Sequence, residues 1–261
     1  MDHDMGEEIA LAGGNMGPVS RRGATVLRPG GPWSPAVHRL MEHCRAAGVT
    51  EVPRPLGFDE AGREIVEFLP GTVPAYPMPR WVWQRPALTS SADLLRRFHD
   101  ASASADRAGP WRFEPREPAE VVCHSDFAPY NLVFRDGRAV GVIDLDFASP
   151  GPRIWDLAHL AYRVVPLSTD RADGFDDDER LDRLEALLRA YAGTDRLEST
   201  MSLTVSSVLE TVIDRLRILA GFSRHQSVEQ QNPELYGHAE LYDRDVAYVR
   251  GLLDSTGVGD S

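Results

Sequence analysis

Short apolar stretches broken by turn residues dominate the first 70 residues of the chain. Val19–Arg21 and Ala24–Arg28 are β-prone pieces that follow a glycine-rich turn. The segment 57–71, GFDEAGREIVEFLPG, has the pattern of two strands around a turn. Between them one helix is expected from about Ser34 to Ala47, with Ser34 as its cap and Pro35 at its first position.

Helical spacing of apolar residues marks the second half. After a proline-rich connector at 72–86, a helix is expected from about Ser91, and beyond Ile154 the chain is expected to be helical to its end. The periodic apolar stretches are 181–192, 201–222 and 239–253. This order predicts an α+β fold, with a small β-rich N-terminal lobe at 1–70 and a larger, mainly helical lobe at 71–261. A ligand cleft between two such lobes is the default expectation.

The polar residues of the middle segment gather around one predicted hairpin. NLVFRDGRAVGVID is two apolar runs separated by Asp136-Gly137, a strong hairpin signal. A two-residue turn predicts that Asn131 faces Val142. Asp144 then emerges on the same face as Asn131, as a diagonal neighbour at roughly 7–8 Å.

Oxygen ligands therefore converge at the open end of this hairpin. Asp126 lies in the loop just before Asn131, so a carboxylate, an amide oxygen and the Asp144 carboxylate come together. Such oxygen-only donors suit Mg²⁺ rather than zinc. The set is typical of phosphoryl transfer, in which one carboxylate orients an acceptor hydroxyl and the others hold magnesium against nucleotide phosphates.

Two stretches carry a resemblance to a known family. HSDFAPYN fits His-x-Asp-x-x-x-x-Asn, and VIDLDFASPGPRIWDLA follows at the right distance, so the chain resembles the aminoglycoside phosphotransferases, relatives of choline kinases. The resemblance implies a two-lobed, protein-kinase-like fold. It also implies that Asp126 is the catalytic base, that His124 braces the catalytic loop, that Asn131 and Asp144 bind magnesium, and that Asp156 anchors the start of a helix, as its N-cap, and braces the loop.

The same resemblance assigns a nucleotide site in the N-terminal lobe. LAGGNMGPV looks like the phosphate-binding loop, and IVEFLPG looks like the hinge whose backbone would meet adenine. The implied nucleotide-binding residues are Gly13, Gly14, Asn15, Arg28, Glu67, Phe68 and Leu69. Glu42 is the only glutamate on the following helix that could pair with Arg28, although family alignment would place Val37 or His38 there. Asp146 is an extra carboxylate, either a further metal ligand or a contact to the acceptor.

The amino-acid composition and charge restrict the classes of binding partner that are expected for the chain. The chain has 28 Lys and Arg against 40 Asp and Glu, a formal net charge of −12, which argues against a general nucleic-acid binder. The acidic run 173–185 is either a solvated loop and helix start or a contact surface for a cationic acceptor. Two cysteines, no signal-peptide pattern and no apolar run long enough to span a membrane predict a cytoplasmic protein without a membrane partner.

These observations predict a magnesium-dependent enzyme. It would move the γ-phosphoryl group of ATP or GTP to a hydroxyl of a small molecule, with an aminoglycoside or related antibiotic as the candidate acceptor. Related enzymes act on choline, homoserine and sugars, so the acceptor stays open. The alternatives are a non-catalytic nucleotide-binding module that acts as a sensor or scaffold, and a phosphoester hydrolase that uses the same metal site.

Overall fold

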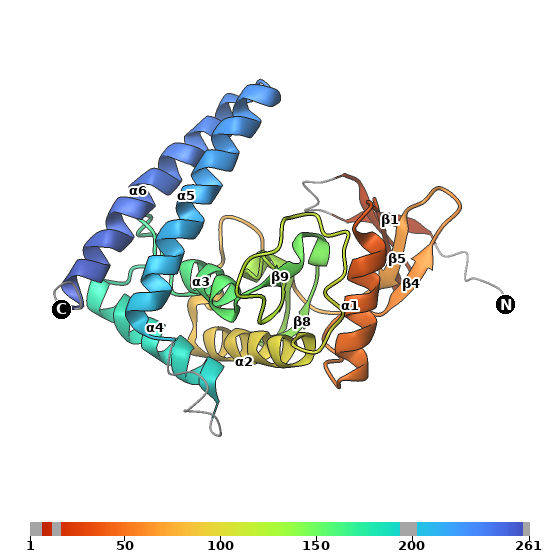
Figure 1. Ribbon diagram of the computed structural model, residues 1–261, viewed down its shortest axis with the longest axis horizontal. Helices are drawn as coiled ribbons and strands as arrows, with labels where there is room; N and C mark the ends of the chain where they lie inside the picture. The colour runs from red at the N-terminus through yellow and green to blue at the C-terminus, as the bar shows by residue number, and fades with distance from the viewer. Residues whose placement is uncertain (1–6, 12–16, 194–202, 258–261) are drawn as a thin grey trace. The chain divides into compact units, whose positions relative to one another are not determined.

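The computed structural model describes residues 7–11, 17–193 and 203–257 and divides the chain into two compact units (Figure 1). One unit comprises Met1–Pro79 and Arg96–Arg153, and the other comprises Arg80–Leu95 and Ile154–Ser261. The sequence-predicted catalytic loop and nucleotide-binding segments all belong to the first unit, so the candidate site is described within it.

An antiparallel five-stranded sheet forms the first part of this unit, in the order β1-β2-β3-β5-β4. Its strands are β1 (Glu8–Leu11), β2 (Val19–Arg22), β3 (Thr25–Arg28), β4 (Pro55–Phe58) and β5 (Glu64–Glu67). The expected strands are confirmed, and β1 is an addition. Strand β3 pairs directly with β5, which places Arg28 opposite Glu64.

Helix α1 (Ser34–Ala46) contacts strand β4 and buries Val37, Leu40, Met41 and Cys44, a spacing that repeats once per helical turn. Its N-cap is Trp33, without a side-chain hydrogen bond, so the prediction of Ser34 as the cap is wrong. The Ser34 hydroxyl instead accepts a hydrogen bond from the Gly31 N–H at 2.9 Å. The hydroxyl therefore faces the preceding turn rather than the free N–H groups of the helix.

Two antiparallel two-stranded sheets complete the first unit. Strand β6 (Val121–Cys123) pairs with β9 (Ser149–Gly151), and β7 (Leu132–Arg135) pairs with β8 (Arg138–Val142). Two 3₁₀ turns, η2 (Pro129–Asn131) and η3 (Leu145–Phe147), lie between these strands. Every chemistry-bearing residue predicted between His124 and Asp146 lies on one of these short elements or in the turns that join them.

Helices α2 (Arg85–Ser102) and α3 (Arg153–Val164) each cross from one unit to the other. Helix α2 begins earlier than expected because Pro86 lies in its first turn, where a proline costs no hydrogen bond. Helix α3 likewise begins before Asp156. The prediction that Asp156 is an N-cap is wrong, since this buried carboxylate lies inside the first turn.

The second unit is helical, as expected. It holds η1 (Arg80–Trp83), α4 (Asp177–Ala192), α5 (Val205–Glu229) and α6 (Pro233–Ser255). Helices α5 and α6 lie side by side and run antiparallel (Figure 1). Buried Asp245 of α6 accepts hydrogen bonds from the Tyr162 hydroxyl at 2.6 Å and from the Thr169 N–H at 2.7 Å, which ties α3 and the loop after it to α6. Among the described helices, none combines the length and apolar character needed to cross a bilayer.

Candidate active site

The β7–β8 hairpin forms with the predicted turn but a different register. Asp136 and Gly137 both have positive φ, 51° and 70°, as a two-residue hairpin turn requires. A bulge then shifts the pairing by one residue, so that Leu132, and not Asn131, lies opposite Val142. The predicted register is therefore wrong beyond the bulge, because one extra residue on β8 moves every later partner by one position.

The shift still brings Asn131 beside the acidic end of the hairpin. The Ile143 N–H donates to the Asn131 carbonyl at 2.9 Å, and Asp144 follows Ile143 directly. Asp144 itself has a left-handed backbone, with φ and ψ both at 60°. A non-glycine residue in this region stores strain, a feature that clusters at functional sites.

Asp126 is held on both carboxylate oxygens. The Tyr130 hydroxyl donates to Oδ1 at 2.8 Å, and the Asn131 Nδ2 donates to Oδ2 at 2.8 Å and to the Asp126 carbonyl at 2.9 Å. Both partners lie within five residues of Asp126, so a single short loop fixes the carboxylate. Because the Nδ2 of Asn131 donates its hydrogen bonds to Asp126, the Oδ1 of Asn131 is the side-chain atom that can coordinate a cation. Tyr130 was not among the sequence-predicted site residues, although it lies inside the motif.

His124 lies beneath this loop, fully buried. Its Nδ1 accepts a hydrogen bond from the Asp126 N–H at 3.2 Å, and its Nε2 lies 2.9 Å from the Ile143 carbonyl. Because a carbonyl can only accept a hydrogen bond, Nε2 must carry the proton. Because Nδ1 accepts a hydrogen bond, it carries none, so the ring is the neutral Nε2–H tautomer. With both nitrogens used, His124 links the loop at Asp126 to the strand end before Asp144.

A four-residue cluster of Arg28, Glu64, Asp144 and Asp146, here called the Arg28 cluster, lies at the junction of the sheet and the hairpin. Each nitrogen of the guanidinium has its own carboxylate: Nε donates to Glu64 at 2.6 Å, Nη1 to Asp144 at 2.9 Å and Nη2 to Asp146 at 2.5 Å. Three carboxylates against one guanidinium leave two excess negative charges in the cluster. That excess suits a divalent cation.

Burial and charge act against each other in the Arg28 cluster. Burial alone would lower the pKa of Arg28, but the charges of Asp146, Glu64 and Asp144 outweigh it and raise that pKa. Burial raises the pKa of Asp146, in spite of Arg28, and the neighbouring Asp144 adds to the rise. Burial would also raise the pKa of Glu64, but His38, Arg28 and Ser34 together hold it below its usual value.

Glu64, and not Glu42, is the partner of Arg28. Glu42 is exposed on α1, whereas Glu64 is fully buried and lies opposite Arg28 in the sheet. His38 of α1 lies behind Glu64, with its Nε2 3.5 Å from Oε1. The only sequence signal for Glu64 was a charged residue at the start of an apolar strand, and its value depended on knowing that β3 and β5 are neighbours.

The predicted hinge residues follow strand β5. The Glu67 N–H donates to the Arg54 carbonyl at 2.9 Å and the Phe68 N–H to the Ala24 carbonyl at 2.8 Å. The Leu69 N–H has no hydrogen-bond partner among the described residues. Within Glu67–Leu69, Leu69 is thus the residue whose backbone donor is available to a ligand.

Three predicted phosphate-loop residues, Gly13, Gly14 and Asn15, lie outside the described residues. Gly17, at the end of the same turn, is described and has a φ of 136°, a conformation that side chains rarely adopt. A Cβ there would lie 2.8 Å from the Pro29 ring. Glycine is therefore required where this segment passes the residue after Arg28.

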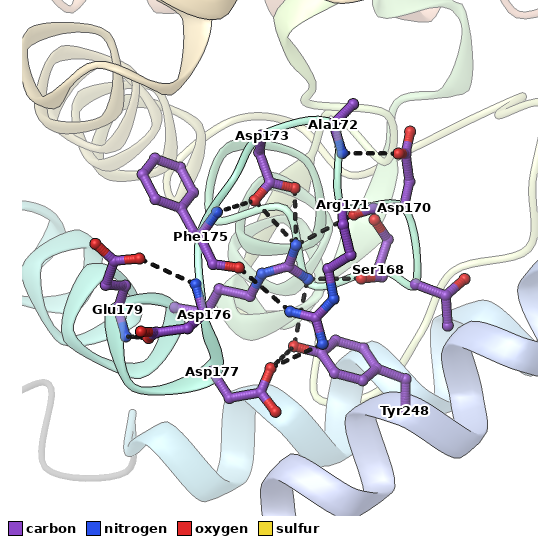
Figure 2. Close-up of polar contacts among 12 residues, drawn as sticks. Ser168, Asp170, Arg171, Ala172, Asp173, Phe175, Asp176, Asp177, Glu179 and Tyr248 are labelled. Carbon is purple, nitrogen blue, oxygen red and sulfur yellow. Dashed lines mark hydrogen bonds and ion pairs between the residues drawn. The ribbon is translucent and has the colours of Figure 1, made fainter.

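The acidic run 173–185 is largely engaged within its own unit (Figure 2). Asp173 binds buried Arg180 through both oxygens, at 3.0 and 2.7 Å. Asp176 caps α4 in a capping box with Glu179, and Asp177 accepts from the Tyr248 hydroxyl at 2.8 Å. These carboxylates build the loop before α4, which favours a structural role for them over binding of a cationic acceptor.

Comparison with known proteins agrees with this site. A model described as the phosphotransferase enzyme family matches residues 106–199. The trifolitoxin immunity protein of Rhizobium leguminosarum bv. trifolii is 36% identical over 197 residues, which span 72% of this chain and 71% of that protein. The chain belongs to the phosphotransferase enzyme family. The matched range includes the predicted catalytic loop and Asp144, which lie in the part of the sequence that carried the resemblance.

Solved structures of this phosphotransferase fold extend the likeness over nearly the whole chain. A choline/ethanolamine kinase family protein from Mesorhizobium loti superimposes with a TM-score of 0.60 at 17% identity, covering 95% of this chain and 94% of that one. A thermostable mutant of aminoglycoside phosphotransferase APH(4)-Ia does so with a TM-score of 0.55 at 16% identity, covering 97% and 96%. The expected kinase-like α+β fold is confirmed.

Proposed function

We propose that this member of the phosphotransferase enzyme family transfers the γ-phosphoryl group of ATP or GTP to a hydroxyl of a small molecule. One observation carries the proposal. Hydrogen bonds of His124 and Asn131 connect the loop that holds the Asp126 carboxylate to the strand end before Asp144. Asp144 and Asp146, which follow this strand end, both bind the Arg28 guanidinium. Phosphoryl transfer needs such an arrangement of positioned charges and little covalent participation by the protein.

Asp126 is the group we assign to the acceptor hydroxyl. With Tyr130 and Asn131 each donating to one of its oxygens, the carboxylate is held in one orientation. It can accept the proton of the attacking hydroxyl as the new bond to phosphorus forms. His124 is the positioning residue of this loop, since both of its nitrogens are already used.

Asn131, Asp144 and Asp146 are the residues we assign to a magnesium ion. The fit rests on their chemistry: all offer oxygen atoms, and Asp144 and Asp146 already converge on one cation, the Arg28 guanidinium. A bound Mg²⁺ would supply charge neutralisation for the phosphates of the nucleotide. Arg28 is then the protein's own cation for the phosphates, and the Leu69 N–H is the donor available to the base.

The acceptor we favour is a compound toxic to the cell rather than a metabolite. The support is the name of the relative with 36% identity, an immunity protein. An aminoglycoside or related antibiotic remains the first class to screen, although the acidic loop before α4 is not free to bind one. Cytoplasmic location stays a prediction.

The test compares Asp126→Ala with the matched surface variant Asp106→Ala, whose side chain is 62% exposed. Thermal shift with ATP and GTP, each with and without Mg²⁺, measures nucleotide binding. A phosphorylation screen over aminoglycosides, other antibiotics, choline and sugars measures transfer. Asp126→Ala should bind nucleotide normally and lose transfer by about 10²–10⁴-fold, while Asp106→Ala should behave as the wild type.

Two other outcomes change the conclusion. Magnesium-dependent nucleotide binding without transfer to any acceptor would favour the non-catalytic sensor or scaffold. Rapid phosphate release that no acceptor accelerates, and that Asp126→Ala abolishes, would favour hydrolysis with water as the natural acceptor. Slow release does not distinguish the two, because a kinase without its acceptor also hydrolyses ATP slowly. Full transfer activity in Asp126→Ala would show that Asp126 is not the base.

A further inference from the structure

The guanidinium of Arg28 occupies the place of a metal ion in its contacts. Its Nη1 and Nη2 bind Asp144 and Asp146, the two carboxylates assigned to magnesium, at 2.9 and 2.5 Å. Arg28 binds the Oδ1 atom of each carboxylate. A divalent cation between the two carboxylates would compete for these atoms, and at such short range its positive charge would also repel the guanidinium. Arg28 and the metal therefore compete.

The three contacts of Arg28 differ in burial. Glu64, on the neighbouring strand, is fully buried and binds Nε at 2.6 Å, the Asp146 side chain is 11% exposed, and the Asp144 side chain is 40% exposed. The register of β3 and β5 fixes the Glu64 contact, since the two residues are direct partners in the sheet. One end of the guanidinium is thus anchored in the sheet, and the other end faces a carboxylate that solvent reaches.

The charge of the Arg28 cluster favours replacement of the contacts of Arg28 with Asp144 and Asp146 by a divalent cation. The cluster carries three carboxylates and one guanidinium, an excess of two negative charges, which the positive charge of nearby Arg112 offsets only in part. A divalent cation at Asp144 and Asp146 would balance this excess, whereas Arg28 alone cannot. Phosphate oxygens of a nucleotide are in turn good partners for a released guanidinium fork.

We propose that Arg28 is an exchangeable internal cation, which holds Asp144 and Asp146 together until a divalent metal and a nucleotide replace it there. On exchange, Nε stays on Glu64, while Nη1 and Nη2 leave Asp144 and Asp146 and donate to phosphate oxygens. This inference rests on the proposed function and adds a consequence to it. Metal alone must bind weakly, because it has to displace an arginine that has no other partner for two of its nitrogens.

Binding of Mn²⁺, followed by the electron paramagnetic resonance of the free ion, tests the exchange without any acceptor. The variants are Arg28→Met and, as a matched control on the neighbouring strand, Arg22→Met, whose arginine pairs with Glu8 at the surface. Arg28→Met should bind Mn²⁺ alone about tenfold more tightly than the wild type, since one or two charge-assisted hydrogen bonds no longer oppose it. Arg22→Met should bind as the wild type does.

The same variants are then measured with a non-hydrolysable ATP analogue and Mn²⁺. Here the order should reverse, and Arg28→Met should bind the complex about tenfold more weakly because the phosphates lose their guanidinium partner. Arg28→Met alone leaves the buried carboxylate of Glu64 without its cation, which could prevent folding. The double variant Arg28→Met with Glu64→Gln removes that charge as well. It should show the same two shifts.

The measurements with and without nucleotide distinguish failure of the exchange from failure of the proposed function. If the wild type binds the manganese–nucleotide complex but Arg28→Met binds Mn²⁺ alone no more tightly, the exchange is disproved and the proposed function stands. If Arg28→Met binds the nucleotide complex as well as the wild type, Arg28 does not move to the phosphates. If the wild type binds neither Mn²⁺ nor the complex, the proposed function fails and the exchange with it.

Discussion

Arg180 and Arg28 both bind carboxylates through their guanidinium groups, but their partners differ in number and in origin. Arg180 of α4 is completely buried and binds the Ser168 and Asp170 carbonyls, both oxygens of Asp173 and, at 3.3 Å, the Tyr248 hydroxyl. Most of these partners come from the loop just before Arg180 (Figure 2). Arg28 instead binds three carboxylates, from a neighbouring strand and from a segment more than a hundred residues away.

The difference lies in charge balance and access. Around Arg180 one carboxylate faces one guanidinium, and neutral oxygens accept the other hydrogen bonds of Nη1 and Nη2, while the buried Nε has no hydrogen-bond partner among the described residues. Around Arg28 the carboxylates outnumber the cation, and one of them is 40% exposed. The proposed exchange of Arg28 for a divalent cation depends on this difference, because of the two only the Arg28 cluster has both an excess of negative charge and an exposed carboxylate.

The largest expected effect is the loss of stability in Arg180→Met. Asp173 would stay buried without its cation, and breaking such a buried pair costs about 3–5 kcal/mol. Urea denaturation measures the change. The control is Arg189→Met on the same helix, where the arginine pairs with Glu185 at the surface and should contribute less than about 1 kcal/mol. Equal effects from the two variants would show that the Arg180 cluster does not stabilise the fold.

Arg28→Met should lose less, about 2–3 kcal/mol in the presence of a chelator, because the exposed Asp144 regains water. Millimolar Mg²⁺ should restore part of this loss, since it binds the folded state at the vacated carboxylates. Thermal denaturation with and without Mg²⁺ checks the difference. If Mg²⁺ restored the stability of Arg180→Met to the same degree, the Arg28 cluster would not differ from the Arg180 cluster in its response to the metal.

The smallest expected effect concerns pH and Glu64. Its pKa in the folded protein lies below the ordinary 4.5, so its ionised form adds stability above that pH, and this contribution is lost as the pH falls through the folded pKa. Glu64→Gln lacks the contribution. Urea denaturation near neutral pH and again well below 4.5 should therefore show the variant's deficit shrinking with acid. A constant deficit would mean that the ion pair of Glu64 and Arg28 adds nothing.

Much of the catalytic segment could be predicted because its geometry is local. The Asp136-Gly137 turn was predicted from two residues whose backbone preferences match a hairpin, and the structure confirms their positive φ values. Asp126 and Asn131 are five residues apart, so one loop brings them together in any fold that forms it. The bulge in β8 was not predicted, although Gly141 lies directly beside it and a glycine inside a strand is a common sign of a bulge.

The partner of Arg28 shows where local reasoning ends. The sequence offered Glu42 because it lies on the next helix, but the helix buries the opposite face and leaves Glu42 exposed. Glu64 is 36 residues from Arg28 and meets it only because β3 and β5 are neighbours in register. Pairing between strands depends on the packing of the whole sheet, which short-range patterns do not record.

By itself, then, the sequence determined the fold class, the family and the oxygen-bearing residues of the catalytic loop and hairpin end, all of which depend on short spacings. The tertiary structure alone decided that Glu64 anchors Arg28, that Asp144 and Asp146 share the same arginine, and that the acidic residues before α4 bind Arg180 and cap a helix. The physical reason is that a charge gains its role from its neighbours in space. For these residues the neighbours come from strands, loops and helices that only folding brings together.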